Sequence, residues 1–186
     1  MTRVGAEMVN PVSGERFVWR HTSASTSGEF AEFDLHLSKG AVVAAPHVHP
    51  HQREDFRVES GAVDLRVGDR RERVEAGGER SVSPGIPHSW GQAGEEESHV
   101  IVRLTPALRS EDFFETFCGL ARDGKANRKG LPRNPLQLAV LAQAHRREFG
   151  LASRPGRVLT MPAVALGAWI GRRAGFRSQY SEYSLD

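Results

Sequence analysis

Short runs in which apolar and polar residues alternate fill the chain between residues 15 and 104. In Glu29–Leu37 the side chains of Phe33, Leu35 and Leu37 fall on one face, and charged or polar side chains fall on the other. This period of two predicts a strand with one buried face. Six further runs follow the pattern: Val42–His49, Glu54–Glu59, Ala62–Val67, Arg71–Val74, Arg80–Ser83 and His99–Leu104. Because Gly, Ser or Pro turns separate them without intervening helices, they predict an antiparallel sandwich or barrel.

The pattern changes to a helical period after residue 105. Ser110 is placed to cap a first helix, which begins with Glu111 and Asp112 and ends near Gly124. The apolar positions of this helix lie on one stripe: Phe113, Phe114, Phe117 and Leu120. The stripe predicts a helix that packs on another part of the molecule.

A second helix is predicted from the cap residue Asn134, with Pro135 at its first position, to Gly150 just past its end. Its apolar face consists of Leu138, Leu141, Ala142, His145 and Phe149. A third helical segment spans roughly Met161–Arg173. We therefore expect a barrel over residues 1–105 and a helical extension over residues 106–186. Helices of this length are marginal alone, so the extension should pack on the barrel or across a homodimer.

Composition limits the class of protein. Hydrophobic residues make up 39% of the 186 positions, enough for the core of one domain with an appendage. Cys118 is the only cysteine, so an internal disulfide is excluded, and we expect a buried thiol in a cytoplasmic protein. The first residues lack the apolar run of a secretory signal. The longest nearly uncharged run, Val158–Gly171, is too short to span a bilayer.

The basic residues are concentrated in the C-terminal part. Residues 121–177 carry twelve basic side chains and only two acidic ones, Asp123 and Glu148. A segment of this kind could contact an anionic membrane surface, or it could be a solvated coat around helices packed elsewhere. The basic residues do not alternate with aromatic residues as in known nucleic-acid-binding modules, so no nucleic-acid partner is expected.

Residues of metal-ligating types gather after position 46. On an extended strand His47 and His49 point to the same side, which they share with apolar residues at positions 43 and 45. After a turn, Glu54 has the same parity as Phe56 and Val58, again an inward-facing set. Two imidazoles and a carboxylate suit first-row divalent metals and leave coordination positions open for a substrate.

A further histidine, His88, follows the rigid turn Pro84-Gly85-Ile86-Pro87, as an immobile ligand would. The two stretches together resemble the signature motifs of the cupin superfamily. The first motif has a glycine, His-x-His, a glutamate and a second glycine, matched here from Gly40 to Gly61. The second motif has a Pro-x-Gly turn before a histidine. The resemblance covers about residues 15–105 and rests on both motifs in order.

Three positions depart from the family pattern. Six residues rather than five separate Gly40 from His47, Ser83 stands where proline is usual, and Gln92 stands where asparagine is common. None of them alters a ligand. The helical tail is similar to the extension of some bacterial single-domain cupins.

The resemblance implies an all-β jelly-roll barrel with a C-terminal α-helical extension. It also implies a divalent metal ion held by His47, His49, Glu54 and His88. Iron or manganese is favoured, with zinc, nickel and cobalt as alternatives. The alternative to a metal site is a cluster of hydrogen-bonded polar side chains in a barrel that has lost its metal. Such a cluster would be costly to desolvate.

Four other residues are candidates for substrate binding. Trp90 shares a side with His88, although core packing is the alternative. Arg103 would pair with an anionic substrate if its face of the strand points inward. Gln52 would line the pocket mouth, or it is a solvated turn amide. Phe56 lies on the predicted inner face.

The resemblance implies a metalloenzyme that acts on a small organic molecule, with an oxygenase or oxidoreductase as the first hypothesis. Metal-assisted isomerisation, dehydration or cyclisation is an alternative. A non-catalytic ligand-binding or sensing module is another, and a metal-free structural domain is a third. In the enzyme hypothesis, Glu54 is the ligand that also moves protons, because a carboxylate can act as a general base.

Overall fold

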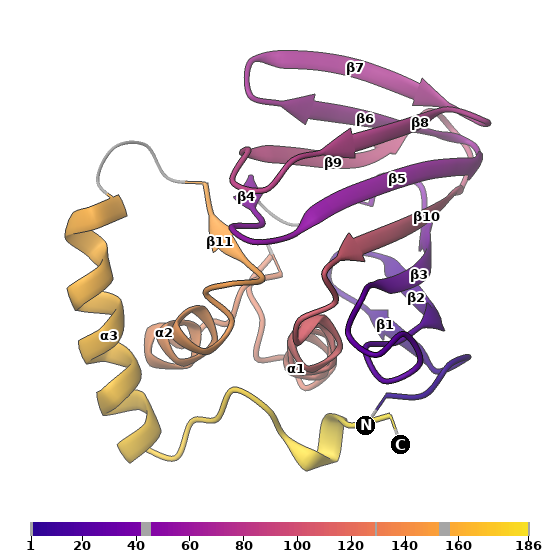
Figure 1. Cartoon of the computed structure of the whole chain (residues 1–186). Helices are drawn as coiled ribbons and strands as arrows, with labels where there is room; N and C mark the ends of the chain where they lie inside the picture. The colour runs from indigo at the N-terminus through magenta and orange to yellow at the C-terminus, as the bar shows by residue number, and fades with distance from the viewer. Residues whose placement is uncertain (1, 42–45, 129, 153–156, 186) are drawn as a thin grey trace.

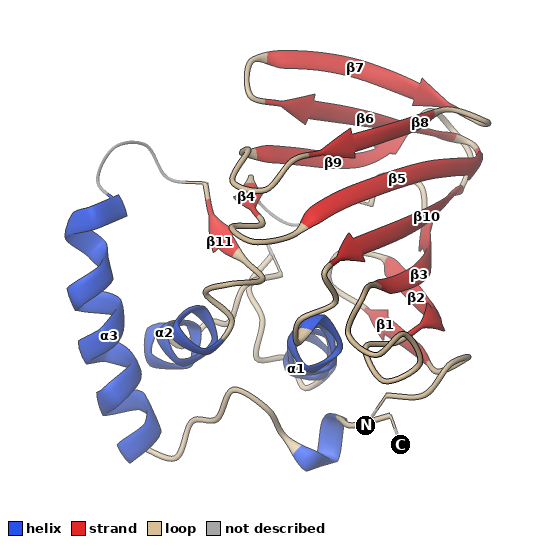
Figure 2. Ribbon diagram, in the orientation of Figure 1, coloured by secondary structure: helices blue, strands red, loops and turns tan. Residues whose placement is uncertain are grey.

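Two antiparallel sheets stack above a group of helices in the computed structural model, which describes residues 2–41, 46–128, 130–152 and 157–185 (Figure 1). In spatial order, the first sheet contains β1 (Glu7–Asn10), β2 (Glu15–His21), β3 (Ala31–Leu37), β10 (Ser98–Thr105), β5 (Arg53–Ser60) and β8 (Glu79–Val82). The second sheet contains β11 (Gly150–Leu151), β4 (His47–Val48), β9 (His88–Ala93), β6 (Ala62–Val67) and β7 (Arg70–Glu75). Figure 2 shows the helices gathered on one side of the strands.

Neighbouring strands are distant in sequence, because β10 lies between β3 and β5. In this register Val102 is opposite Phe33 on one side and Phe56 on the other. The arrangement is a jelly-roll barrel with a helical extension, which confirms the predicted fold class. A strand overlaps each of the seven predicted runs. The run Val42–His49 is described only from residue 46 onward, so the expected inward positions 43 and 45 lie outside the described residues.

The inner faces of the strands follow the alternation of the sequence. The predicted inward residues of β3 are all buried, and Val100, Val102 and Leu104 of β10 are buried opposite them. The first helix, α1 (Ser110–Arg122), extends this core. The ring of Phe114 lies 5.2 Å from that of Phe17 and 5.3 Å from that of Phe33, measured between centroids. The apolar stripe of α1 therefore packs against the first sheet.

The predicted cap of α1 is wrong. The N-cap residue is Arg109, and its guanidinium donates a hydrogen bond to Asp112. The hydroxyl group of Ser110 instead donates to the backbone oxygen of Ala107 and accepts from the side-chain amide of Gln52. Ser110 therefore ties the helix to the turn that precedes β5.

The second helix is shorter than predicted. The cap is confirmed, because Asn134 accepts hydrogen bonds from the backbone of residues 136 and 137. However, α2 (Pro135–Ala144) ends before the predicted boundary, and Gly150 begins β11. The reason is tertiary: the chain beyond the helix pairs with β4 instead of continuing the helical turn.

The third helix, α3 (Arg157–Arg173), packs against α2 and contains the predicted segment Met161–Arg173. Its outer face exposes Leu166 and Trp169, which have exposed fractions of 58% and 52%. Within the described ranges, none of the helices has both the length and the apolar character needed to cross a bilayer. The expected homodimer stays a prediction.

The C-terminal segment crosses the outside of α1 and places Tyr183 directly over Gly119, which has no side chain there (Figure 1). A Cβ atom at Gly119 would lie 2.2 Å from the tyrosine ring, far inside van der Waals contact. The hydroxyl group of Tyr183 donates to the carboxylate of Asp123, so the ring is held at this position. A glycine in the middle of a helix is therefore required here by packing.

We expect Gly119→Ala to lower the free energy of unfolding by about 1–3 kcal/mol, because the added methyl group collides with Tyr183. In a Tyr183→Ala background the same change should be neutral or stabilising by up to about 1 kcal/mol, since alanine is the better helix former. Urea denaturation of the four proteins measures both effects. If Gly119→Ala has the same effect in both backgrounds, the close packing of the C-terminal segment is contradicted.

Glu15 is an acidic residue on the inner face of the barrel. It shares the inward-facing side of β2 with Phe17 and Trp19 and is 3% exposed. Its carboxyl group accepts hydrogen bonds from Ser13 and, at 3.5 Å, from the side-chain amide of Asn10. Burial raises the pKa of Glu15 to about 7, although the hydrogen bond from Ser13 opposes the shift. The folded protein therefore holds a proton that the unfolded chain releases near pH 4.5.

Between about pH 4.5 and 7, the free energy of unfolding should fall by about 1.4 kcal/mol per pH unit because of Glu15, and this contribution should level off above pH 7. Glu15→Gln removes this titration. The difference between the variant and the wild type in urea denaturation at pH 5, 6, 7 and 8 separates Glu15 from the histidines. A pH-independent difference would show that Glu15 is already ionised in the folded protein.

Candidate metal centre

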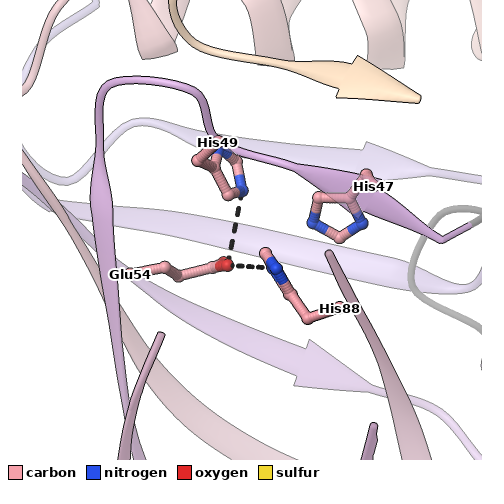
Figure 3. A group of neighbouring side chains, drawn as sticks. All are labelled: His47, His49, Glu54 and His88. Carbon is pink, nitrogen blue, oxygen red and sulfur yellow. Dashed lines mark hydrogen bonds and ion pairs between the residues drawn. The ribbon is translucent and has the colours of Figure 1, made fainter. Parts of the chain in front are cut away.

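Four buried side chains from both sheets meet inside the barrel. His47 lies in β4 opposite His88 at the start of β9, His49 follows β4, and Glu54 lies in β5 of the other sheet. One ligand atom from each residue lies within 4.8 Å of those from the other three (Figure 3). The predicted convergence of these residues is therefore confirmed, and the separation is short enough for a single ion to contact all four.

Two backbone carbonyl groups orient the histidines. Nδ1 of His49 lies 2.6 Å from the carbonyl oxygen of Glu148, and Nδ1 of His88 lies 3.0 Å from that of Ile86. A carbonyl oxygen only accepts hydrogen bonds, so in both rings Nδ1 carries a proton and donates. The Nε2 atoms are thereby directed toward Glu54. Carbonyl partners of this kind typically fix the tautomer and ring orientation of metal-ligating histidines.

The carboxylate of Glu54 lies between these two Nε2 atoms. Its Oε2 atom is 2.6 Å from Nε2 of His88 and 3.3 Å from Nε2 of His49. Burial by itself would raise the pKa of Glu54, but the charge of His49 and the hydrogen bond with His88 hold it well below its ordinary value. Burial lowers the pKa of His88, but the hydrogen bond to Glu54, the charge of that carboxylate and the hydrogen bond to Ile86 together outweigh burial and raise it.

This donor set fits a divalent cation. With Nδ1 protonated, a neutral imidazole would turn the lone pair of Nε2 toward a carboxylate, which is repulsive. A second proton on the ring relieves the repulsion, and so does a metal ion. At 3.3 Å, Nε2 of His49 lacks hydrogen-bond geometry with Glu54, and among the described residues it is a buried atom without another partner. Imidazole nitrogens with one carboxylate are typical ligands of first-row metals.

Phe149 covers the histidines on the side of the helical extension. Its ring stacks on His47, with centroids 5.2 Å apart and planes inclined by 21°, and lies 6.3 Å from His49. The adjacent cavity has a volume of about 40 Å³ and is lined by ligands and by the rings of the barrel and α1. A water molecule needs about 10–15 Å³ on this measure, so the space accommodates an ion with a few waters.

Trp90 and Phe56 lie at the inner wall of the site. Trp90 lines the cavity and is buried, and its indole Nε1 has no hydrogen-bond partner among the residues that the structure describes. Phe56 packs edge-on against Trp90 with centroids 4.8 Å apart, and it lies 6.4 Å from the ring of His88. Trp90 therefore lines the cavity and carries a buried N–H donor, and Phe56 packs against its ring.

Gln52 and Arg103 are placed differently from the prediction. The side-chain amide of Gln52 is buried and donates to the backbone oxygens of Pro106 and Ala107, so it fixes the turn before α1. Arg103 lies on the outer face of β10, pairs with Glu32 at 2.7 Å, and is 45% exposed. The expected contact of Arg103 with a substrate at the metal centre is contradicted, because its strand face points outward.

The sequence interpretation missed the contribution of residues 147–152. This segment runs beside residues 46–51: the amide of His51 donates to the carbonyl of Arg147, and the amide of Ala152 donates to that of Pro46. It supplies both the carbonyl that orients His49 and the ring that covers His47. Phe149 and Gly150, at the end of the predicted helix, were the residues that could have indicated this segment in the sequence. The backbone carbonyl that orients His49 could not have been predicted, because every residue has one.

Comparisons with known proteins agree with this architecture. Residues 33–103 match the cupin domain family. Two proteins named "Probable oxidoreductase patJ", from Aspergillus clavatus and Penicillium expansum, are 27% and 25% identical over 97% of this chain. The chain spans 59% of the length of these relatives. A solved RmlC-like cupin from Shewanella frigidimarina superposes with a TM-score of 0.49 at 19% identity, over 57% of this chain and 88% of that one.

The matched segment contains β3 to β10 almost completely, and with them all four converging residues. The motifs, the jelly-roll topology and the family match all point to the same assignment. The part of the chain that is similar to the cupin domain family is therefore the segment of residues 33–103.

Proposed function

We propose that this protein is a metal-dependent cupin enzyme that acts on a small organic molecule, most specifically as an oxidoreductase of the oxygenase type. The observation that carries the proposal is the meeting of three imidazoles and Glu54 within 4.8 Å, with two of the rings held by backbone carbonyls. The two relatives named as probable oxidoreductases favour redox chemistry over isomerisation, dehydration or cyclisation. Iron or manganese is the proposed metal, with zinc, nickel or cobalt as alternatives; zinc, which has no redox chemistry, would indicate one of those non-redox reactions.

The ligands would be His47, His49, Glu54 and His88. When bound, the metal would supply Lewis-acid polarisation and open coordination positions for the oxygen atoms of a substrate. The protein's own residues shape what happens around it. The carbonyls of Glu148 and Ile86 keep the imidazoles of His49 and His88 oriented, and the aromatic rings of the cavity limit the number of water molecules near the site.

Two groups at the site can act on a substrate directly. The indole N–H of Trp90 is a buried donor that has no partner among the described residues, and it would orient an oxygen atom of the substrate once the cavity opens. Glu54 would accept a proton when its carboxylate loosens from the metal, because a carboxylate that is released from a metal can act as a general base. We propose Glu54 as the catalytic base and Trp90 as a substrate-binding residue, with Phe56 holding Trp90 in place.

The first test is the metal content of protein purified without chelators or a nickel column. About one equivalent of iron or manganese per chain is expected for the wild type. Single alanine variants of His47, His49, Glu54 and His88 should each lose at least about tenfold in affinity, because each removes a ligand from a preformed shell. Measurement is by mass spectrometry of the metals and by titration of the metal-free protein.

His99→Ala is the matched control, since His99 is a partly exposed histidine that stacks on His36 outside the site. This variant should keep the metal. Ligand variants that bind metal as well as His99→Ala does would contradict the proposed centre, as would a wild-type protein that binds none of the five ions.

The second test separates the two roles of Glu54. Glu54→Gln retains an oxygen atom that can contact a metal but removes the base, so turnover per bound metal should fall about 100-fold. The measurement is dioxygen consumption by metal-loaded protein across a panel of small phenols, diols and keto acids. If turnover falls only in proportion to the metal content, Glu54 serves as a metal ligand and not as a base. Binding without any consumption by the wild type would favour a non-catalytic ligand-binding protein.

A further inference from the structure

The third helix, α3, stands at the edge of the molecule with α2 on its inner side (Figure 1). Small residues allow the two helices to approach closely. A Cβ atom at Gly167 would lie 3.1 Å from that of Ala139, and one at Gly171 would lie 2.8 Å from the side chain of Val140. Ala168, on the same side of the helix, is fully buried. One face of α3 is therefore packed on α2, and the opposite face points away from the protein.

The outer face of α3 is apolar. Four large side chains of this helix are between 41% and 58% exposed: Met161, Leu166, Trp169 and Ile170. They are half of the exposed large hydrophobic side chains in the part of the chain that the structure describes. Leu166 is followed by Trp169 and Ile170 at three and four positions, so these side chains lie together on one face. A helix that is apolar on both faces is normally covered on both, and an exposed apolar patch indicates an interaction surface.

The charges in and around this helix are all positive. Residues 149–181 include no aspartate or glutamate, and they contain five arginines: Arg154, Arg157, Arg172, Arg173 and Arg177. Arg157 begins α3, whereas Arg172 and Arg173 lie in its last turn. The guanidinium of Arg173 lies 4.5 Å from the centroid of the Trp169 ring, so it belongs to the same surface as the apolar residues. The surface therefore combines exposed hydrophobic side chains with positive charge.

A second copy of this chain does not suit the surface. A helix of 17 residues is about 25 Å long and about 10 Å wide, so its outer face offers about 250 Å². A stable dimer buries about 800 Å² on each partner. Pairing α3 with its own copy also brings arginines together in either orientation, because they occur at both ends of the helix. The repulsion between these like charges opposes a homodimer through this face.

The surface of an anionic membrane satisfies both features of α3. Lipid acyl chains cover an apolar helix face without the minimum area that a protein interface needs, and the negative headgroups complement the arginines. Tryptophan is enriched at this level of a bilayer because its ring is amphipathic. The stacked pair of Trp169 and Arg173 combines a ring of this kind with a cation for the headgroups.

We propose that α3 docks in the plane of an anionic membrane, with Leu166, Trp169 and Ile170 inserted about 5–10 Å into the boundary between headgroups and acyl chains. Arg172 and Arg173 contact the headgroups. The contact is reversible, because one helix face and a few charges supply a limited free energy of binding. It goes beyond the function proposed for the metal centre, since it uses none of the metal-ligating residues.

The test uses the full chain with vesicles of phosphatidylcholine alone and with vesicles of equal parts phosphatidylcholine and phosphatidylserine. Trp169 reports on insertion because it is 52% exposed, whereas the other two tryptophans, Trp19 and Trp90, are 1% and 5% exposed. The protein should cosediment with the mixed vesicles at least about tenfold more tightly than with phosphatidylcholine alone. Its tryptophan emission should shift to the blue, and added salt should weaken the binding.

Variants of exposed residues locate the contact. Leu166→Glu should weaken binding to the mixed vesicles about tenfold or more, because it places a carboxylate in the apolar layer beside anionic lipids. Val9→Glu is the matched control and should bind as the wild type does, since Val9 is 49% exposed on β1, on the opposite side of the molecule (Figure 1). Arg173→Gln should weaken binding about fivefold. Trp169→Phe should keep most of the binding but lose the blue shift.

Three results would overturn the proposal. The first is a wild-type protein that binds neither kind of vesicle, or the same loss of binding in Leu166→Glu and Val9→Glu. The second is a protein that is dimeric by light scattering and becomes monomeric in Leu166→Glu, because a second copy would then cover α3. The third is cosedimentation without any change in tryptophan emission, which would place the lipid contact elsewhere on the surface. This third measurement uses the wild type, so it decides the question even if Leu166→Glu fails to fold.

Discussion

A carboxylate in the dry interior of a barrel must have positive charge beside it, and the placement of Glu54 follows this constraint. In water such a group is stabilised by solvent, but here it is buried among apolar strands and aromatic rings. The neighbouring imidazoles from the second sheet supply the compensating charge, either as protons or through a shared metal ion. The two sheets are thus joined at this point by electrostatics as well as by apolar packing.

The same constraint explains why the helical extension belongs to the site. An imidazole can serve Glu54 or a metal through Nε2 only if Nδ1 finds an acceptor elsewhere. For His88 the acceptor is local, the carbonyl of Ile86 two residues earlier. For His49 it is the carbonyl of Glu148, nearly 100 residues away in the chain. The extension therefore determines the chemistry of one ligand, and β11 holds the necessary segment against β4.

Much of this could be predicted from local pattern. Alternation identified seven of the described strands because a half-buried strand shows its period directly, but it did not identify β1, β2, β9 or β11. The spacing of His47, His49 and Glu54 identified an inward-facing cluster. The prediction that Ser110 caps α1 was wrong because Ser110 has a tertiary partner, Gln52, which outweighs its local preference for the cap position. The outward direction of Arg103 depended on which face of β10 is buried. Pairing of β11 with β4 depends on backbone hydrogen bonds, to which side-chain identity contributes little.

Access to the metal and orientation of the metal ligands are connected through adjacent residues. Glu148 holds His49 through its backbone, and Phe149 closes the cavity over His47. A substrate larger than the small cavity has to displace the Phe149 ring, and any backbone movement that achieves this pulls on the neighbouring carbonyl. A side-chain rotation alone would open the cavity while leaving His49 oriented. A cavity of about 200 Å³ between α1 and α2, which Phe149 also lines, gives the ring space for that second route without movement of the strand. The empty volume in the extension therefore gives the site a way to open that preserves its ligand geometry.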